Sequence, residues 1–95
     1  MKQDEPQPLS FLTNHAQVLV CISHDPGIRL REIGETVGIT ERAAHRIVGE
    51  LASAGFVSRE RQGRRNHYTI QAQRLLPDPL ARGRTVSDLL SIWAR

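Results

Sequence analysis

The chain has 95 residues, of which 39% are apolar and 24% charged, so it suits one small soluble domain with a compact core. Its single cysteine, Cys21, excludes an internal disulfide and is predicted to be a buried, inert thiol. The net charge is +3 and twelve of the thirteen basic residues are arginines, which suits an anionic partner, although a GC-rich genome would give the same bias.

The sequence contains neither a predicted signal peptide nor a predicted membrane segment. Residues 1–8 are polar, contain two prolines and lack the apolar core of a signal peptide, so a disordered tail is expected there. The longest apolar run, residues 18–22, is far too short to cross a bilayer. Together these features predict a cytoplasmic protein without a membrane segment.

A first helix is predicted from a cap at Thr13 or Asn14 to about His24, where Pro26 and Gly27 end it. The spacing of its apolar residues predicts that they lie on one side of the helix. The residues expected on that side are Leu12, Ala16, Leu19, Val20 and Ser23. A short extended stretch, residues 28–30, follows.

Two further helices form the centre of the sequence. The second is predicted over residues 31–37 and ends at Gly38, a residue common after helix ends. The third is predicted over residues 41–54, with Thr40 as its N-cap and Gly55 after its end. Its buried stripe is predicted from the spacing of Ala44, Val48 and Leu51, with Ile47 at the border.

After Gly55 the sequence pattern changes from a helical period to a period of two residues, which is typical of strands. Residues 56–62 and 66–71 are predicted to form a hairpin joined across Gly63, with Val57, Tyr68 and Ile70 pointing inward. An irregular connector follows, and residues 85–95 are predicted to form a last helix capped by Thr85. Its apolar stripe consists of Val86, Leu89, Leu90 and Trp93. This stripe either covers the domain's own core or packs against a second copy.

Positive charge is concentrated around the predicted hairpin. Five arginines and one glutamate between residues 58 and 74 give a local charge of +4, so the remaining residues together carry −1. Such crowding is unfavourable unless it meets negative charge, and the closely spaced phosphates of a nucleic acid supply it. The alternative is an ordinary solvated hairpin.

The order is helix, short extended stretch, helix, tight turn, helix and hairpin. Over residues 12–71 this order, with the turn "VGIT", the exit "AGFVSRE" and the hairpin "GRRNHYTI", resembles the winged helix-turn-helix of MarR-type bacterial transcription regulators, and more loosely the ArsR type. The resemblance implies an α+β, mainly α fold with three helices, a two- or three-stranded wing and an added C-terminal helix. It divides the chain into a tail (1–8), a DNA-binding domain (9–72), a connector (73–84) and a C-terminal helix (85–95).

In that family the third helix enters the major groove of DNA and the wing lies on the backbone or minor groove. Carried over by position, the resemblance assigns DNA contacts to Thr40, Arg42, His45, Arg46, Arg59, Arg61, Arg64 and Arg65. Family members dimerise through terminal helices, which implies a dimer contact at Val86, Leu89, Leu90 and Trp93. The implied function is a transcriptional regulator, a repressor that binds a palindromic operator as a homodimer.

Several alternatives stay open or are disfavoured. Glu41 and Glu50 balance the arginines of the third helix, so surface salt bridges are one alternative there, and a protein- or RNA-interaction module is the alternative function. The four histidines and Cys21 are scattered without metal-ligand spacing, and no catalytic set is evident, so no metal, cofactor or enzyme activity is expected. The chain lacks the extra helices that enclose an effector pocket in the family, so no small-molecule effector is expected.

Overall fold

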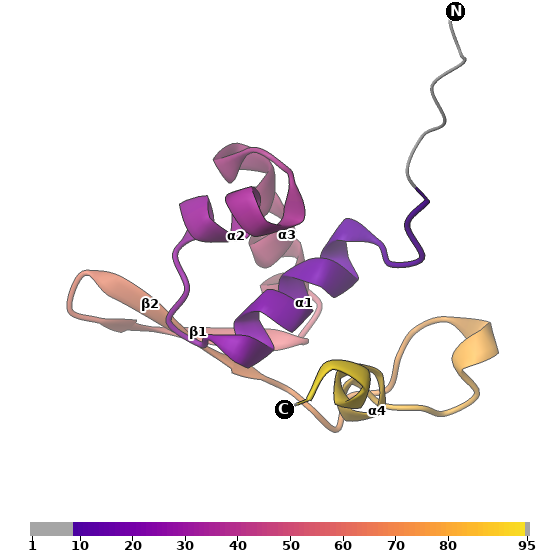
Figure 1. Ribbon diagram of the computed structural model, residues 1–95. Helices are drawn as coiled ribbons and strands as arrows, with labels where there is room; N and C mark the ends of the chain where they lie inside the picture. The colour runs from indigo at the N-terminus through magenta and orange to yellow at the C-terminus, as the bar shows by residue number, and fades with distance from the viewer. Residues whose placement is uncertain (1–8, 95) are drawn as a thin grey trace, which may run out of the picture.

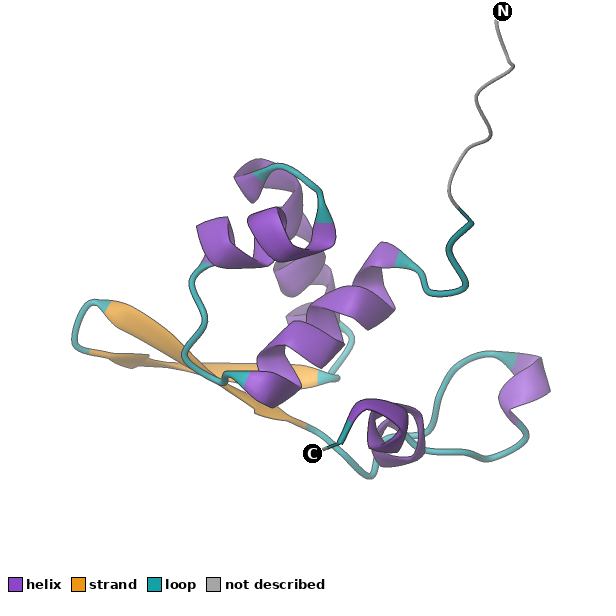
Figure 2. Ribbon diagram, in the orientation of Figure 1, coloured by secondary structure: helices purple, strands orange, loops and turns teal. Residues whose placement is uncertain are grey.

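The computed structural model describes residues 9–94 and shows three helices packed beside a two-stranded antiparallel sheet (Figure 1). A fourth, short helix lies next to the first (Figure 2). The elements in chain order are α1 (Asn14–His24), α2 (Leu30–Val37), α3 (Glu41–Ser53), β1 (Val57–Gln62), β2 (Arg65–Ile70), a 3₁₀ turn (Pro79–Ala81), α4 (Val86–Leu90) and a second 3₁₀ turn (Ser91–Trp93). The predicted winged helix-turn-helix with an added C-terminal helix is therefore confirmed.

Threonine caps begin three of the helices, as predicted. The Thr13 and Thr40 hydroxyls accept hydrogen bonds from backbone amides three residues later, at 3.1 and 3.0 Å. Thr85 forms a capping box in which Asp88 accepts from the Thr85 amide at 2.9 Å. The start of α2 differs, because Arg29 stands at its N-cap and the Arg29 amide donates to the Glu32 carboxylate at 3.0 Å.

The turn between α2 and α3 depends on two glycines. Gly38 ends α2 with φ of +89°, a left-handed conformation that glycine adopts without strain. Gly34 lies under the turn, and a Cβ atom there would come within 2.7 Å of the Ile39 carbonyl oxygen. Glycine at position 34 therefore lets the backbone of the turn pack directly onto α2.

The buried face of α1 differs from the predicted one. Leu19 is buried as expected, but Ser23 is exposed and its hydroxyl donates to the Val20 carbonyl. The buried residues of α1 are Val18, Leu19, Cys21 and Ile22. The difference arises because α1 contacts α2, α3, β2 and α4, so it buries more than one stripe. Burial raises the pKa of the Cys21 thiol, in agreement with the predicted inert cysteine.

The wing is two-stranded. Its register runs from Val57 opposite Ile70 to Gln62 opposite Arg65, and the turn between the strands contains Gly63 with φ of +65°. The extended stretch before α2 forms no strand, since Leu30 already belongs to the helix. One backbone bond joins the loop after α1 to the sheet, from the Tyr68 amide to the Pro26 carbonyl at 2.9 Å.

The C-terminal segment folds back on the domain. The predicted helix over residues 85–95 is shorter, because α4 ends at Leu90 and continues as a 3₁₀ turn. Val86 is 0% exposed and belongs to the same core as Ile22 and Val48. The Val86 amide donates to the Arg74 carbonyl, and the Trp93 carbonyl lies 3.0 Å from a His24 ring nitrogen. No helix within residues 9–94 is long and apolar enough to cross a membrane.

Candidate nucleic-acid interface

The exposed face of α3 presents the residues expected to contact DNA. Arg42, His45 and Arg46 are exposed. They lie on the side of the helix away from its buried residues, which are Ala44, Ile47, Val48 and Leu51. Ile47, expected at the border, is part of the core. Gly49 follows on the same face, one turn after His45 and Arg46, and a Cβ atom there would meet no atom of residues 9–94 within 4 Å.

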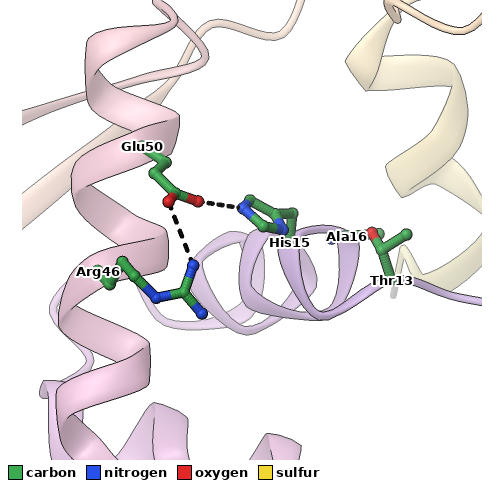
Figure 3. A network of polar contacts seen from close by, with 5 residues as sticks. All are labelled: Thr13, His15, Ala16, Arg46 and Glu50. Atoms are coloured by element: carbon green, nitrogen blue, oxygen red, sulfur yellow. Dashed lines mark hydrogen bonds and ion pairs between the residues drawn. The ribbon is translucent and has the colours of Figure 1, made fainter.

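Arg46 is held in a network that reaches α1 (Figure 3). Its Nη1 atom lies 3.2 Å from Oε2 of Glu50, and Oε1 of Glu50 lies 2.7 Å from Nε2 of His15. The hydrogen bonds from His15 and Arg46 hold the pKa of the Glu50 carboxyl below its ordinary value. The surface salt bridge considered as an alternative for α3 is therefore present between Arg46 and Glu50. Among residues 9–94, Arg42 has no such partner.

The wing carries four exposed arginines that differ in their contacts. Arg61 donates from Nε to the Gly63 carbonyl at 3.2 Å, and Arg65 donates from Nη2 to the Gly27 carbonyl at 2.8 Å. Within residues 9–94, the Arg59 and Arg64 side chains form no hydrogen bond or ion pair. The hairpin tip projects away from the helices (Figure 1). Arg64 is exposed and belongs to the turn at this tip, because β1 ends at Gln62 and β2 begins at Arg65.

An open cleft of about 490 Å³ joins the wing to the start of α3. It is lined by four arginines, of which Arg64 and Arg65 come from the wing and Arg29 and Arg31 from the start of α2. Glu41, in the first turn of α3, also lines the cleft, and Oε2 of Glu35 lies 4.0 Å from Nε of Arg31. Arg29 and Arg31 were not among the residues predicted from the sequence. The signal that could have found them is the pair of arginines that flanks Leu30 at the beginning of a helix.

Thr40 lies at the N-terminus of α3, and its hydroxyl oxygen accepts the capping hydrogen bond from the Ala43 amide. The hydroxyl keeps its own hydrogen, which can donate to an anion together with the free backbone amides of that turn.

The C-terminal residues expected at a dimer contact divide into two kinds. Leu89, Leu90 and Trp93 are half-buried, whereas Val86 is buried inside the single chain. The strongly exposed apolar residues at the two ends of the chain are Leu9, Phe11 and Ile92, and Phe11 is 96% exposed. Leu9, Phe11, Ile92 and Trp93 line one apolar groove beside α1.

Solved structures with the same fold come from two bacteria. This chain is 21% identical to the Mycobacterium tuberculosis MarR family protein Rv2887 in complex with salicylic acid, with a TM-score of 0.54 over 85% of this chain and 59% of that one. It is 20% identical to the PcaV transcriptional regulator of Streptomyces coelicolor in complex with its natural ligand, with a TM-score of 0.55 over 86% and 60%. The chain thus spans about three-fifths of their length. The comparison with curated proteins gives no match.

The amino-acid sequence matches a protein-family model. Residues 9–65 match the model of the MarR family, and this range contains all three main helices and most of the wing. The match covers more than half of the chain, so the protein belongs to the MarR family.

Proposed function

We propose that this protein is a transcription regulator that binds double-stranded DNA, with α3 in the major groove and the wing on the backbone or minor groove. The observation that carries the proposal is the cleft that Arg29, Arg31, Arg64 and Arg65 line beside the start of α3. These four positive charges outnumber the two acids near them, Glu41 in the lining and Glu35 beside Arg31, so the cleft favours an anionic ligand. The phosphate backbone of a DNA duplex supplies several closely spaced negative charges.

The exposed face of α3 carries side chains suited to reading bases in the major groove of DNA. Arginine donors are planar and paired, so Arg42 and Arg46 can read guanine edges, and His45 can contribute a further hydrogen bond. Gly49 leaves the helix backbone open to close approach. The arginines of the cleft would fix the orientation of the domain on the duplex, while the α3 side chains would select the sequence.

We further propose a homodimer that binds a palindromic operator and represses transcription. A single winged helix contacts too little DNA for high selectivity, whereas two copies related by two-fold symmetry read two half-sites. The proposed contact is the half-buried group Leu89, Leu90 and Trp93. The exposed residues Phe11 and Ile92 extend it, and Val86 is excluded because it is buried. Residues 9–72 would then form the DNA-binding unit, with the connector and last helix placing the contact.

One experiment separates this function from the alternative interaction module. The chain is titrated in fluorescence anisotropy with a random DNA duplex, a single-stranded RNA and a double-stranded RNA of equal length, at several salt concentrations. DNA binding whose affinity falls steeply with salt, with weaker RNA binding, supports the proposal. Equal or tighter binding to RNA, or no binding to any of them, would reject it.

The similar structures bear on the expectation that no small molecule is bound, because one is a complex with salicylic acid and the other a complex with its natural ligand. An apolar pocket of about 330 Å³ lies between α1, the end of α3 and α4. Its lining includes Leu19, Leu51, Phe56 and Leu89, with His15 and Glu50 as polar groups, a composition typical of small-molecule sites. We propose this pocket as the place for a small aromatic effector with a polar group, and thermal unfolding with and without salicylate tests it: an unchanged melting temperature argues against salicylate as that effector.

A further inference from the structure

Three polar side chains from two helices meet at the edge of the exposed face of α3 (Figure 3). Each oxygen of the Glu50 carboxylate has its own partner: His15 of α1 at 2.7 Å and Arg46 of α3 at 3.2 Å. An ionised carboxylate only accepts hydrogen bonds, so the His15 ring must carry a hydrogen on Nε2. Glu50 is thereby held from one side by α1 while it holds Arg46 on the other.

This arrangement changes how Arg46 can meet DNA. Only Nη1 of Arg46 is engaged by Glu50, so its remaining donors stay available on the exposed face of the helix. The neighbouring carboxylate offsets the charge of Arg46, which weakens its attraction to phosphates of any sequence. A guanidinium that is already oriented loses less freedom when it forms a bidentate contact with a base. Both effects favour recognition of one site over general attraction.

We propose that Glu50 is a positioning residue for Arg46, that His15 anchors Glu50, and that the pair increases sequence selectivity at the expense of affinity for random DNA. The proposal rests on the DNA-binding function proposed above. Stability is a poor measure of it, because an exposed ion pair four residues apart on a helix contributes little to folding. The informative quantity is the ratio of affinities for a preferred and a random duplex.

The test compares Glu50→Gln with the wild type on two duplexes: one selected by the wild-type protein from a random pool, and one of random sequence. Glu50→Gln should bind the random duplex severalfold more tightly, with a salt dependence steeper by about one unit, because Arg46 can pair with a phosphate. The affinity ratio should fall by about fivefold or more, which is within the range of a lost bidentate base contact. His15→Ala should lower the ratio in the same direction and by less.

Glu41→Gln is the matched control, since it makes the same charge change on the same helix. Within residues 9–94 the Glu41 side chain has no hydrogen bond or ion pair. Glu41→Gln should therefore tighten both duplexes by the same factor and leave the ratio unchanged. Thermal unfolding of each variant confirms that the domain remains folded.

A double-mutant cycle shows whether Glu50 acts through Arg46. In the background of Arg46→Ala, adding Glu50→Gln should leave the ratio unchanged. If Glu50→Gln alone leaves the ratio of the wild type unchanged, or if it lowers the ratio as much without Arg46 as with it, the positioning role is rejected while DNA binding stands. If the wild type binds no duplex, or binds the two duplexes equally, the proposed function has failed and the inference falls with it.

Discussion

The Nη2 atom of Arg65 donates a hydrogen bond to the carbonyl oxygen of Gly27 at 2.8 Å, which joins the wing to the loop before α2. Together with the backbone bond from Tyr68 to Pro26, this contact fixes where the hairpin leaves the domain. One donor of Arg65 is therefore used inside the protein, whereas the side chain of its neighbour Arg64 donates no hydrogen bond within residues 9–94. The two arginines, adjacent in sequence, should behave differently when they are replaced.

Arg64→Ala should weaken binding to all duplexes alike and reduce the salt slope by about one unit, because one phosphate contact is lost. Arg65→Ala should in addition loosen the wing, since the tether to Gly27 is removed. Hydrogen exchange of the β2 amides measures this second effect. Faster exchange in both variants, or in neither, would show that Arg65 has no special structural role.

Arg29 and Arg31 should contribute to binding although they lie outside the third helix and the wing. Replacing both with Ala should reduce the salt slope by about two units, since each is expected to face a phosphate across the cleft. Arg84→Ala is the control, because Arg84 lies outside that cleft. Anisotropy titrations at several salt concentrations give the slopes, and equal slopes for wild type and double variant would remove α2 from the interface.

Replacing Gly49 and Gly34 with alanine should change the stability of the fold in opposite directions. Gly49→Ala should stabilise the free protein by about 0.5–1 kcal/mol, because alanine is the better helix former and the added methyl group meets open space. The same methyl group should weaken DNA binding if the helix backbone approaches the duplex. Gly34→Ala should destabilise the fold, because its Cβ atom would lie 2.7 Å from the Ile39 carbonyl. Melting temperatures and duplex affinities of both variants check this pair.

A negative charge at the exposed apolar residue Ile92 should break the proposed dimer. Ile92→Glu should convert a dimer to a monomer without unfolding it, because Ile92 is 70% exposed in the single chain. Leu80→Glu, at another exposed leucine, is the matched control and should remain dimeric. Light scattering at micromolar concentration measures both. A wild-type chain that is monomeric under those conditions contradicts the proposed assembly.

The Glu50 network should make stability depend on pH on the acid side. The pKa of Glu50 is lowered in the folded state by hydrogen bonds from His15 and Arg46, from an ordinary value of 4.5. Its contribution is therefore fully present above pH 4.5 and is lost as the pH falls through the lower folded-state pKa. The difference in unfolding free energy between wild type and Glu50→Gln should shrink over that range, as measured by denaturant unfolding. A difference that is constant with pH would mean that the carboxylate charge adds no stability.

Local patterns in the sequence were sufficient for most of the fold. The threonine caps, Gly38 and the change of period after Gly55 predict the helix and strand limits to within a few residues, because these signals act over one turn. The buried face of α1 was misjudged because four elements contact it, and no single period describes such a helix. The Arg46–Glu50 pair could be anticipated from its spacing, but the contribution of His15 and the position of Arg29 and Arg31 depend on tertiary packing.

The burial of Val86 links the last helix to the helix proposed to read DNA. Val86 occupies the same core as Val48 and Leu51, on the back of α3. Withdrawing the C-terminal segment would therefore expose core residues of α1 and of the end of α3 as well as remove the proposed dimer contact. The C-terminal segment and the base-reading surface should unfold as one cooperative unit, so that a partner or ligand bound to the former would change the rigidity of the latter.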